Sequence, residues 1–303
     1  MRITLVHNPG AGRQNLGAAK KLTRFLEQQG YDVRYVSAKD EGWKKSLKKP
    51  ADMVVVAGGD GTVAKLTRRM AGRGIPVGVL PSGTANNIAR TLGLLEQPFE
   101  DLVRAWKDGR RVKLDLGVAK GPWGERYFVE GMGVGVFASL LTSPAAEVKK
   151  QKNAVAAALG RMRKHAEKSE PLEIHARLDG KDISGRYLMI EALNLPYVGP
   201  NLHLAHEKQP GDGELVVVLV TEAERSRLLY YLEHWQENRE RLAVLPSKRG
   251  RRLELEWTGF PLHIDDKLKP KPKSKPKEIA GPAEARLDGD TVEFIVPADA
   301  QQA

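Results

Sequence analysis

The stretch Met53–Val63, MVVVAGGDGTV, constrains the fold of this chain more than any other. Its first five residues are apolar, which is typical of a strand buried on both faces. Three glycines then permit close backbone approaches that a side chain would block: Gly58, Gly59 and Gly61. Thr62 is a residue type that caps helices. Apolar residues follow it at helical spacing: Val63, Leu66 and Met70. A strand, a glycine turn and a helix start are therefore predicted, which is a favourable arrangement for binding phosphate.

One acidic residue, Asp60, lies inside this turn. A carboxylate beside a phosphate site is electrostatically unfavourable unless it binds Mg²⁺ or accepts a proton. Asp60 is therefore a candidate catalytic residue. The alternative interpretation is a tight α/β turn in which the carboxylate only caps a helix.

Composition places the chain among globular proteins that bind anions. Its 303 residues permit two domains, and 41% hydrophobic with 29% charged residues argues against disorder. It has no cysteine, which excludes disulfides and thiolate metal sites. We see no membrane-spanning run, and Met1–Val6 is predicted to be a strand rather than a signal peptide, so we expect a cytoplasmic location. The net charge of +11 favours a nucleotide, a nucleic acid or an acidic membrane surface as partner.

Strands alternate with helices in the first part of the chain. The predicted strands are Arg2–Val6, Tyr31–Val36, Met53–Ala57 and Val77–Leu80. This alternation indicates a doubly wound, mostly parallel sheet, in which ligands bind beyond the carboxyl ends of the strands. Three turns are expected at those ends: Asn8–Arg13, Gly58–Thr62 and Pro81–Asn87. In the third turn, Thr84 and Asn86 have side chains that can bond a nucleotide; the alternative is that they only cap the following helix.

The three turns carry a family resemblance. NPGAG, GGDGT and PSGTANNIAR, in this order, resemble the catalytic domain of the diacylglycerol kinase and sphingosine kinase family, and more closely its soluble bacterial lipid kinases. GGDGT alone is shared with NAD kinases, whereas GTANNIAR is more specific to the lipid kinases. The resemblance continues through Lys113–Gly117, Phe128–Phe137 and Asn194–Val220, and so covers nearly the whole chain.

We expect a nucleotide-binding α/β domain at residues 1–122 and a β-rich lipid-substrate domain at residues 123–290. A strand and tail at residues 291–303 would return to the first domain. The resemblance implies a β-sandwich-like second domain and an overall NAD kinase/diacylglycerol kinase-like fold. The second half also shows two hairpin signals, Asp179-Gly180 and Asp288-Gly289, and one helix predicted from about Glu222 to Leu242.

The resemblance implies ATP and Mg²⁺ as cofactors. ATP would lie across the three turns, and the candidate binding residues are Asn8, Pro9, Gly12, Arg13, Gly58, Gly59, Gly61, Thr62, Gly83, Thr84 and Asn86. Asp60 would take the proton of a lipid hydroxyl or position Mg²⁺. Asp265 is the second candidate catalytic residue, and it would support the metal together with Asp115.

Two further acidic segments bear on metal binding. The loop Gln209–Glu214 resembles a structural or regulatory metal loop of the family, with Gln209, Asp212 and Glu214 as candidate ligands; an ordinary Asp-Gly turn is the alternative. The family usually reads Asp-Gly-Glu where this chain has Asp265-Asp266-Lys267. That departure leaves the choice between Asp265 and Asp266 open.

Two basic segments suggest a membrane surface. Lys267–Lys277, KLKPKPKSKPK, is predicted to be extended and solvated, and Glu147–Lys168 is predicted to be a basic helix. In each case the alternative is a solvated segment without a partner. Aromatic residues are not interleaved with the basic runs, so we expect no nucleic-acid partner. A homodimer is possible.

The sequence as a whole indicates an ATP- and Mg²⁺-dependent lipid kinase that phosphorylates a hydroxyl of a lipid such as diacylglycerol or a sphingoid base, at times bound peripherally at the inner face of the membrane. Two alternatives stay open: an NAD kinase-like enzyme, and a catalytically silent protein that binds a lipid or a nucleotide.

Overall fold

The structure is a computed structural model that describes residues 1–11, 19–142, 153–235, 244–269 and 280–300. The chain divides into two compact units. Unit 1 comprises Met1–Leu116, Gln209–Gly211 and Asp290–Ala303; unit 2 comprises Gly117–Lys208 and Asp212–Gly289. Two long strands, β5 (Arg110–Gly121) and β19 (Gly281–Val296), contribute residues to both units.

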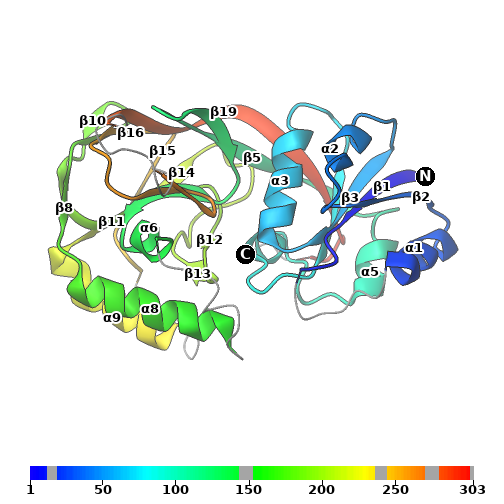
Figure 1. Cartoon of the computed structure of the whole chain (residues 1–303), viewed down its shortest axis with the longest axis horizontal. Helices are drawn as coiled ribbons and strands as arrows, with labels where there is room; N and C mark the ends of the chain where they lie inside the picture. Colours follow the sequence, from blue (N-terminus) through cyan, green and yellow to red (C-terminus); the bar gives the residue numbers. More distant parts are fainter. Residues whose placement is uncertain (12–18, 143–152, 236–243, 270–279, 301–303) are drawn as a thin grey trace. The chain divides into compact units, whose positions relative to one another are not determined.

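Unit 1 is built on a parallel sheet with the strand order β4-β3-β1-β2. Its strands are β1 (Arg2–His7), β2 (Asp32–Ser37), β3 (Met53–Gly58) and β4 (Val77–Pro81), and Phe294 of β19 pairs with Val77 in parallel. Its helices are α1 (Ala19–Gln28), α2 (Trp43–Ser46), α3 (Asp60–Met70), α4 (Asn87–Thr91) and α5 (Phe99–Arg104). They are drawn in blue and cyan in Figure 1. The predicted mostly parallel α/β fold of this region is confirmed.

Apolar patterning explains these elements. Every residue of β3 is buried, as expected for a strand covered on both faces. Helix α3 buries the apolar stripe that its sequence predicted, Val63, Leu66 and Met70. Helix α1 buries Leu22 and Leu26, and the chain turns after it at Gly30, whose φ of +85° suits a residue without a side chain.

Unit 2 is a strand-rich unit in which antiparallel sheets pack face to face. One sheet runs β15-β14-β11-β7-β17-β18, and in the other β10, β9, β16 and β19 are neighbours. The strands are β6 (Gly124–Phe128), β7 (Gly131–Gly135), β8 (Leu172–Ile174), β9 (Ala176–Leu178), β10 (Lys181–Asp182), β11 (Gly185–Leu193), β12 (Tyr197–Val198), β13 (Leu202–His203), β14 (Leu215–Thr221), β15 (Ser247–Gly250), β16 (Arg252–Trp257), β17 (Leu262–Ile264) and β18 (Lys267–Lys269). Buried side chains from both sheets form one core, as in the predicted sandwich.

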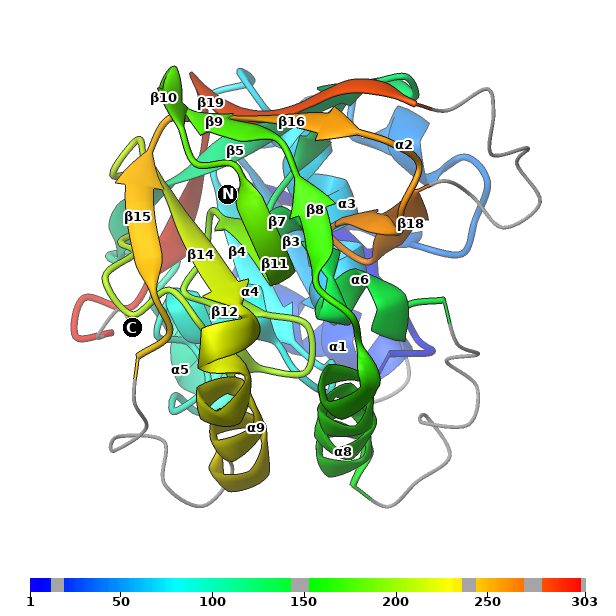
Figure 2. The same cartoon turned by 90° about the vertical axis from the view of Figure 1, so that its left-hand side faces the viewer.

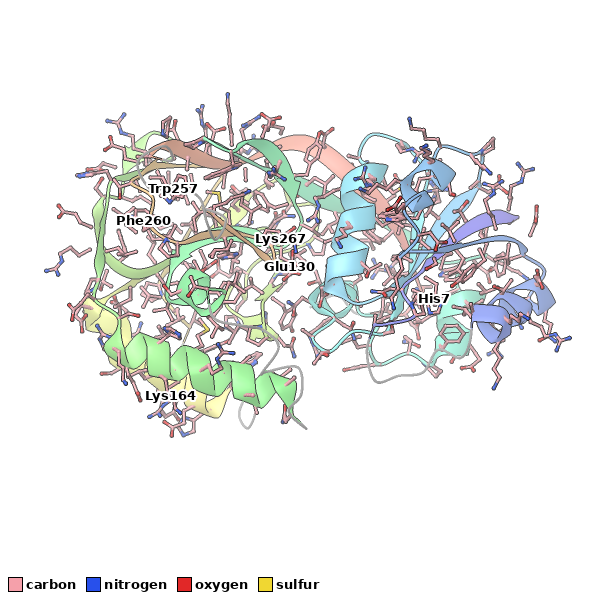
Figure 3. All side chains as sticks on the ribbon, viewed as in Figure 1. His7, Glu130, Lys164, Trp257, Phe260 and Lys267 are labelled. Atoms are coloured by element: carbon pink, nitrogen blue, oxygen red, sulfur yellow. The ribbon has the colours of Figure 1, made fainter. Side chains whose placement is uncertain are left out.

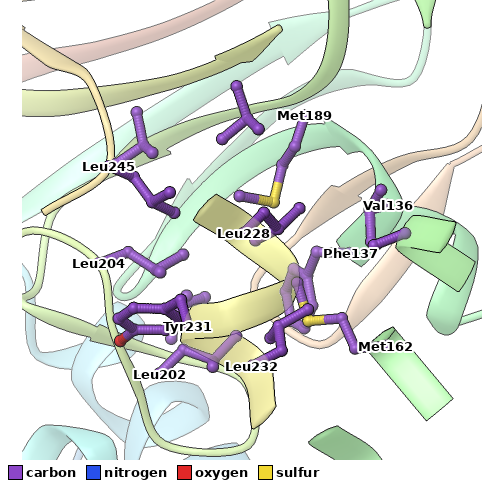
Figure 4. Packing of buried hydrophobic residues seen from close by; sticks show 14 of the residues in the cluster. Val136, Phe137, Met162, Met189, Leu202, Leu204, Leu228, Tyr231, Leu232 and Leu245 are labelled. Atoms are coloured by element: carbon purple, nitrogen blue, oxygen red, sulfur yellow. The ribbon is translucent and has the colours of Figure 1, made fainter. Parts of the chain in front are cut away.

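Helices of unit 2 cover a second core. They are α6 (Val136–Leu140), α8 (Ala154–Lys168), the 3₁₀ turn η1 (Glu222–Glu224) and α9 (Arg225–His234). Helices α8 and α9 lie side by side (Figure 1, Figure 2). In this core Leu232 of α9 lies beside Phe137 and Met162, whereas Tyr231 lies beside Leu202 and Leu204 (Figure 4). Helix α8, the described part of the predicted basic helix, packs on unit 2 through its buried residues Leu159, Met162 and Ala166.

A tryptophan closes one end of the sandwich core. The indole Nε1 of Trp257 donates a hydrogen bond of 2.7 Å to the carbonyl oxygen of Phe260, just beyond β16 (Figure 3). The ring of Trp123 meets the Trp257 ring edge-on, with centroids 5.1 Å apart. The polar group of this buried side chain is thereby satisfied.

The structure corrects two local predictions. Asp179-Gly180 forms the predicted turn between β9 and β10, with φ of +50° and +77°. Asp288-Gly289 does not form a hairpin, because β19 continues through it. The segment beginning at Lys267 is not wholly solvated, since Lys267–Lys269 form β18 against β17 and Lys269 is 6% exposed. The pairing of β18 with β17 therefore buries a lysine that the local run of charges and prolines had suggested would be solvated.

Three predicted segments fall partly outside the described residues. The remainder of the lysine segment, residues 270–279, lies there. So do residues 143–152 of the predicted basic helix and residues 236–243 of the predicted helix that contains α9.

A buried acid–histidine pair crosses the central strand of unit 2. Glu191 of β11 and His263 of β17 both lie opposite Gly133 of β7, and both side chains are fully buried. His263 Nε2 is 2.6 Å from Glu191 Oε2, and Nδ1 is 2.9 Å from the carbonyl oxygen of Asp265. Because that carbonyl can only accept, Nδ1 carries a proton. A further proton lies between Nε2 and Oε2, because two acceptors without one would repel each other at 2.6 Å.

The pair perturbs both of its members. Burial raises the pKa of Glu191. Burial by itself lowers the pKa of His263, but the charge and hydrogen bond of Glu191 raise it above its usual value. The two groups can meet only because Gly133 has no side chain. A Cβ there would be 2.1 Å from Glu191 Oε2.

We therefore predict opposite effects for two glycine-to-alanine changes in unit 2. Gly133→Ala should lower the free energy of unfolding by about 1–3 kcal/mol, because the new methyl displaces a buried charged pair. Gly160→Ala is the matched control: it lies within α8 with nothing within 4 Å of the added Cβ. Alanine there should raise stability by roughly 0.5–1 kcal/mol. Urea unfolding of both variants measures the difference. Equal free energies of unfolding for the two variants would contradict the steric overlap between an alanine at position 133 and Glu191.

Candidate functional site

The carboxyl ends of three parallel strands lie level in unit 1. His7 of β1 is paired with Ala57 of β3, and Ala57 is paired with Leu80 of β4. The turns that follow these strands therefore begin side by side. Two backbone bonds join them: Asn8 N–H donates to the Ala57 carbonyl at 2.8 Å, and Ser82 N–H donates to the Gly58 carbonyl at 3.0 Å.

A side-chain hydrogen bond ties the first turn to the second. Asn8 Nδ2 donates to Thr62 Oγ1 at 2.9 Å. Thr62 does not cap the helix, contrary to the sequence prediction: α3 starts at Asp60 with Gly59 as its N-cap, so Thr62 lies within the first helical turn. The hydroxyl is thereby free to accept from Asn8. Gly58 has to be small here, since its Cβ would lie 2.8 Å from the Thr62 Cβ.

The second and third turns touch through their backbones. A Cβ on Gly59 would lie 2.8 Å from the Cα of Gly83, and a Cβ on Gly83 would lie 2.5 Å from the Cα of Gly59. Real Cβ atoms do not approach other atoms this closely, so any side chain at either position would push the turns apart. The two glycines thus fix the distance between the second and third turns.

Asn86 shapes the third turn from within. It adopts a left-handed conformation with φ of +53°, which asparagine tolerates better than most residues. Its side chain bonds Gly83 twice, accepting from the N–H at 2.8 Å and donating to the carbonyl at 3.0 Å. Asn86 occupies the N-cap position of α4, but its side chain makes no capping bond. Thr84 is exposed.

Asp60 supplies the bond that Asn86 does not. Its Oδ1 accepts the backbone N–H of Ile88, in the first turn of α4, at 3.1 Å. Burial raises the pKa of Asp60, against backbone N–H groups at Asn86, Asn87 and Ile88 that lower it. The carboxylate therefore has two properties at once. It orients the third turn, and it is a stronger proton acceptor than an exposed aspartate.

The structure thus gathers most of the predicted nucleotide-binding residues in unit 1. The turns bring together Asn8, Gly58, Gly59, Thr62, Gly83 and Asn86 around Asp60. Pro9 and Gly61 are exposed on the same turns. Two candidates, Gly12 and Arg13, lie outside the described residues.

Two residues at these turns were missed by the sequence analysis. The amine nitrogen of Lys39 lies 3.0 Å from where a Gly10 Cβ would be, so this lysine extends across the first turn. It follows β2, whose carboxyl end lies at the same edge of the sheet, and that position was the available signal. Ser82 Oγ is buried in the third turn and has no hydrogen-bond partner among the described residues.

Asp265, in unit 2, is held by backbone N–H groups. Its Oδ1 accepts from Val129, Glu130 and Gly131 at 3.0, 2.8 and 3.3 Å. Its φ is +49° and it is 6% exposed. Asp266 is exposed and pairs with Lys267 at 2.7 Å. The inward carboxylate of this segment is therefore that of Asp265. Asp60 and Asp265 belong to different units, and Asp115 is buried on β5 in unit 1.

The predicted metal loop holds cationic side chains. Lys208 Nζ bonds Asp212 Oδ1, and Arg249 Nη2 lies 3.0 Å from Asp212 Oδ2. Arg249 Nε also bonds the Glu214 carboxylate at 2.8 Å. Both oxygens of the candidate ligand Asp212 are thus taken by cations, so this arrangement does not fit a divalent ion. Among the described residues, no group of three or more His, Cys, Asp or Glu side chains is placed to hold a metal.

We predict that Asp265 and Asp266 differ sharply in their structural importance. Asp265→Ala leaves buried N–H groups of the β6–β7 turn without an acceptor, which should lower the free energy of unfolding by about 1–3 kcal/mol. Asp266→Ala, the neighbouring control, should change it by no more than about 0.5 kcal/mol. Denaturant unfolding compares the two, and a larger loss for Asp266→Ala would refute the assignment.

Comparison with known proteins agrees with the motifs. The model of the diacylglycerol kinase catalytic domain matches residues 2–119. The chain is 26% identical over 234 residues to the diacylglycerol kinase of Bacillus subtilis, covering 73% of this chain and 74% of that relative. It is 26% identical over 282 residues to the diacylglycerol kinase of Mycobacterium tuberculosis, covering 87% of this chain and 88% of the relative. The predicted resemblance is confirmed.

Solved structures show the same fold. A diacylglycerol kinase from Bacillus anthracis superposes with a TM-score of 0.68 at 19% identity, covering 97% of this chain and 96% of that chain. The yeast NADH kinase superposes with a TM-score of 0.53 at 9% identity, covering 98% and 84%. At these identities the likeness concerns the fold alone. In the described part of the chain, no helix has the length and apolar character needed to cross a membrane.

Proposed function

We propose that this chain, whose residues 2–119 belong to the diacylglycerol kinase catalytic domain family, is an ATP- and Mg²⁺-dependent lipid kinase. Its acceptor would be a hydroxyl of a lipid such as diacylglycerol or a sphingoid base. The observation that carries the proposal is the meeting of three glycine turns around Asp60 at the carboxyl edge of a parallel sheet. The relatives named diacylglycerol kinases, which align over most of the chain, support it.

Unit 1 has the features that bind a polyphosphate. Helix α3 starts directly at the second turn, so its first N–H groups and its dipole favour an anion there. The Asn8–Thr62 bond and the Gly59–Gly83 contact hold the turns in place before any ligand arrives. Mg²⁺ bound with the nucleotide would neutralise charge on the transferred phosphate. The chain's own contribution is positioning, which is most of what phosphoryl transfer requires.

Asp60 would accept the proton of the lipid hydroxyl. Its raised pKa brings it nearer to the working pH, where a general base is most effective. The Ile88 N–H binds one carboxylate oxygen and so sets the direction of the other. Asp265 remains a proposed second functional carboxylate. Asp265→Asn, which tolerates the left-handed backbone, would test it: a folded variant with normal turnover would remove Asp265 from the mechanism.

We predict that Asp60→Asn lowers kcat by roughly 10²-fold or more, the usual scale for a positioned base. The amide oxygen can still accept from Ile88, so the melting temperature should hardly change. Asp101→Asn is the control: it makes the same substitution at a half-exposed aspartate in α5 that pairs with Arg104. Labelled ATP with a panel of lipids measures turnover. Near-normal kcat in Asp60→Asn would exclude it as the base.

The same assay separates the alternatives. NAD should be offered as an acceptor beside the lipids, since the fold is shared with an NADH kinase. Phosphorylation of NAD but of no lipid would favour an NAD kinase-like enzyme. ATP binding without turnover on any acceptor would favour a catalytically silent binding protein. This alternative is considered because Asp266 and Lys267 stand where the resembled family usually has Gly and Glu.

The proposed lipid substrate requires access to a membrane. We propose a protein of the cytoplasm that contacts an anionic leaflet through its positive charge, +11 over the chain. Lysines beyond β18 are the proposed contact, and they lie outside the described residues: Lys271, Lys273, Lys275 and Lys277. Lys269 is left out because it is buried. Self-association as a homodimer also stays a proposal.

We predict that the protein sediments with acidic but not neutral vesicles, and that salt releases it. Each lysine near an anionic surface contributes about 1 kcal/mol, and screening within about 10 Å at 0.1 M ionic strength removes most of it. Replacing these four lysines by Gln should weaken binding. Turnover of a detergent-dispersed, short-chain lipid should stay unchanged and serves as the control. Equal sedimentation of the variant and the wild type would mean that the contact lies elsewhere.

A further inference from the structure

A lysine is wholly buried in the loop that precedes β14. The side chain of Lys208 is 0% exposed, and its backbone N–H donates to the Ala205 carbonyl at 3.0 Å. An ammonium group is removed from water at a high cost unless a partner of opposite charge compensates it. The partner is Asp212, four residues further on, whose Oδ1 accepts from Lys208 Nζ. The same oxygen accepts the Glu214 N–H at 3.1 Å.

A second cation reaches this loop from β15. Arg249 binds Asp212 Oδ2 at 3.0 Å and Glu214 Oε2 at 2.8 Å through two of its nitrogens. Its third, Nη1, donates to the carbonyl oxygen of Glu207 at 3.1 Å. One guanidinium thus gathers a carbonyl and two carboxylates of the loop, as its planar set of donors allows.

The oxygens gathered here are of the types that a hard divalent cation binds. Mg²⁺ takes carboxylate and carbonyl oxygens in an octahedral shell at about 2.0–2.1 Å. An ion at Asp212 would have to displace Lys208 or Arg249, or lie in contact range of both positive charges. The Lys208 side chain is fully buried, so its ammonium group could reach water only if the side chain gave up its present packing. The loop therefore already contains the positive charge that a metal would bring.

We propose that Lys208 and Arg249 replace a divalent cation in the loop Glu207–Glu214, so that this loop is held without metal. The proposal concerns the folded structure and does not depend on the reaction. It assigns Lys208 a positioning role: the buried ammonium fixes the Asp212 carboxylate, and Asp212 in turn receives Arg249 from β15 and the Glu214 N–H.

The first test measures melting temperature without nucleotide, after treatment with a chelator and then with millimolar Mg²⁺ or Ca²⁺. The wild type should melt at the same temperature in all three conditions. Asp212→Asn is measured beside it. A rise with Mg²⁺ in the wild type that is lost in Asp212→Asn would overturn the proposal, because a ligand of the folded state stabilises it.

The second test removes the buried charge. Lys208→Met keeps most of the side-chain volume but leaves Asp212 with one cation fewer, and it should lower the melting temperature by about 5 °C or more. Lys248→Met, an exposed lysine on β15, is the matched control and should melt like the wild type. A Lys208→Met variant as stable as the wild type would overturn the proposal.

The third test asks whether the two residues act as a pair. If Lys208 acts through Asp212, the losses from Lys208→Met and Asp212→Asn should not add in the double variant. Fully additive losses would overturn the proposal. Should Lys208→Met not fold, Arg249→Gln replaces it in the same cycle with Asp212→Asn, because Arg249 is more exposed and its loss is milder.

Discussion

The candidate site of unit 1 depends on the contact between Gly59 and Gly83. Each glycine occupies the space that a Cβ on the other would need, so the second and third turns meet backbone to backbone. The polar side chains of the second and third turns are positioned by that contact. Asp60 follows Gly59 directly and reaches the N–H of Ile88, while Asn86 closes the third turn on Gly83. At this contact the turns consist of residues that lack side chains, which suits the phosphate binding that we propose for this edge of the sheet.

Unit 2 fixes its geometry by a different means, which is buried charge. Glu191 and His263 meet across Gly133, and Lys208 meets Asp212 within one loop. A charge away from water is tolerated only when its partner is in place, so each pair penalises any shift in strand register or loop position. His263 also bonds the carbonyl of Asp265, whose carboxylate holds the β6–β7 turn. One chain of hydrogen bonds therefore joins β11, β17 and the β6–β7 turn at Asp265, next to Asp266 and Lys267.

Much of the fold could be predicted from local patterns. The apolar run Met53–Ala57 predicted β3, and glycine turns after successive strands predicted that three turns would meet. The roles of individual side chains could not, because they depend on partners far along the chain. Asp60 bonds a residue 28 positions away, and Glu191 bonds one 72 positions away. Thr62 looked like a cap because of its residue type, but Gly59 is the N-cap and the helix starts at Asp60. Lys269 looked solvated among prolines, but pairing with β17 buries it.

Charge is used in two ways in this chain, and the difference bears on its need for metal. In unit 1 the proposed phosphates would meet N–H dipoles, the Asp60 carboxylate and the ammonium of Lys39 at the first turn. Mg²⁺ bound with a nucleotide would bring further positive charge from outside. In the loop Glu207–Glu214 the positive charge belongs to the protein itself, because it is carried by the side chains of Lys208 and Arg249. A side-chain cation is present at every metal concentration. The proposed reaction would then need metal only because the nucleotide binds it. The stability of the folded protein would not depend on metal.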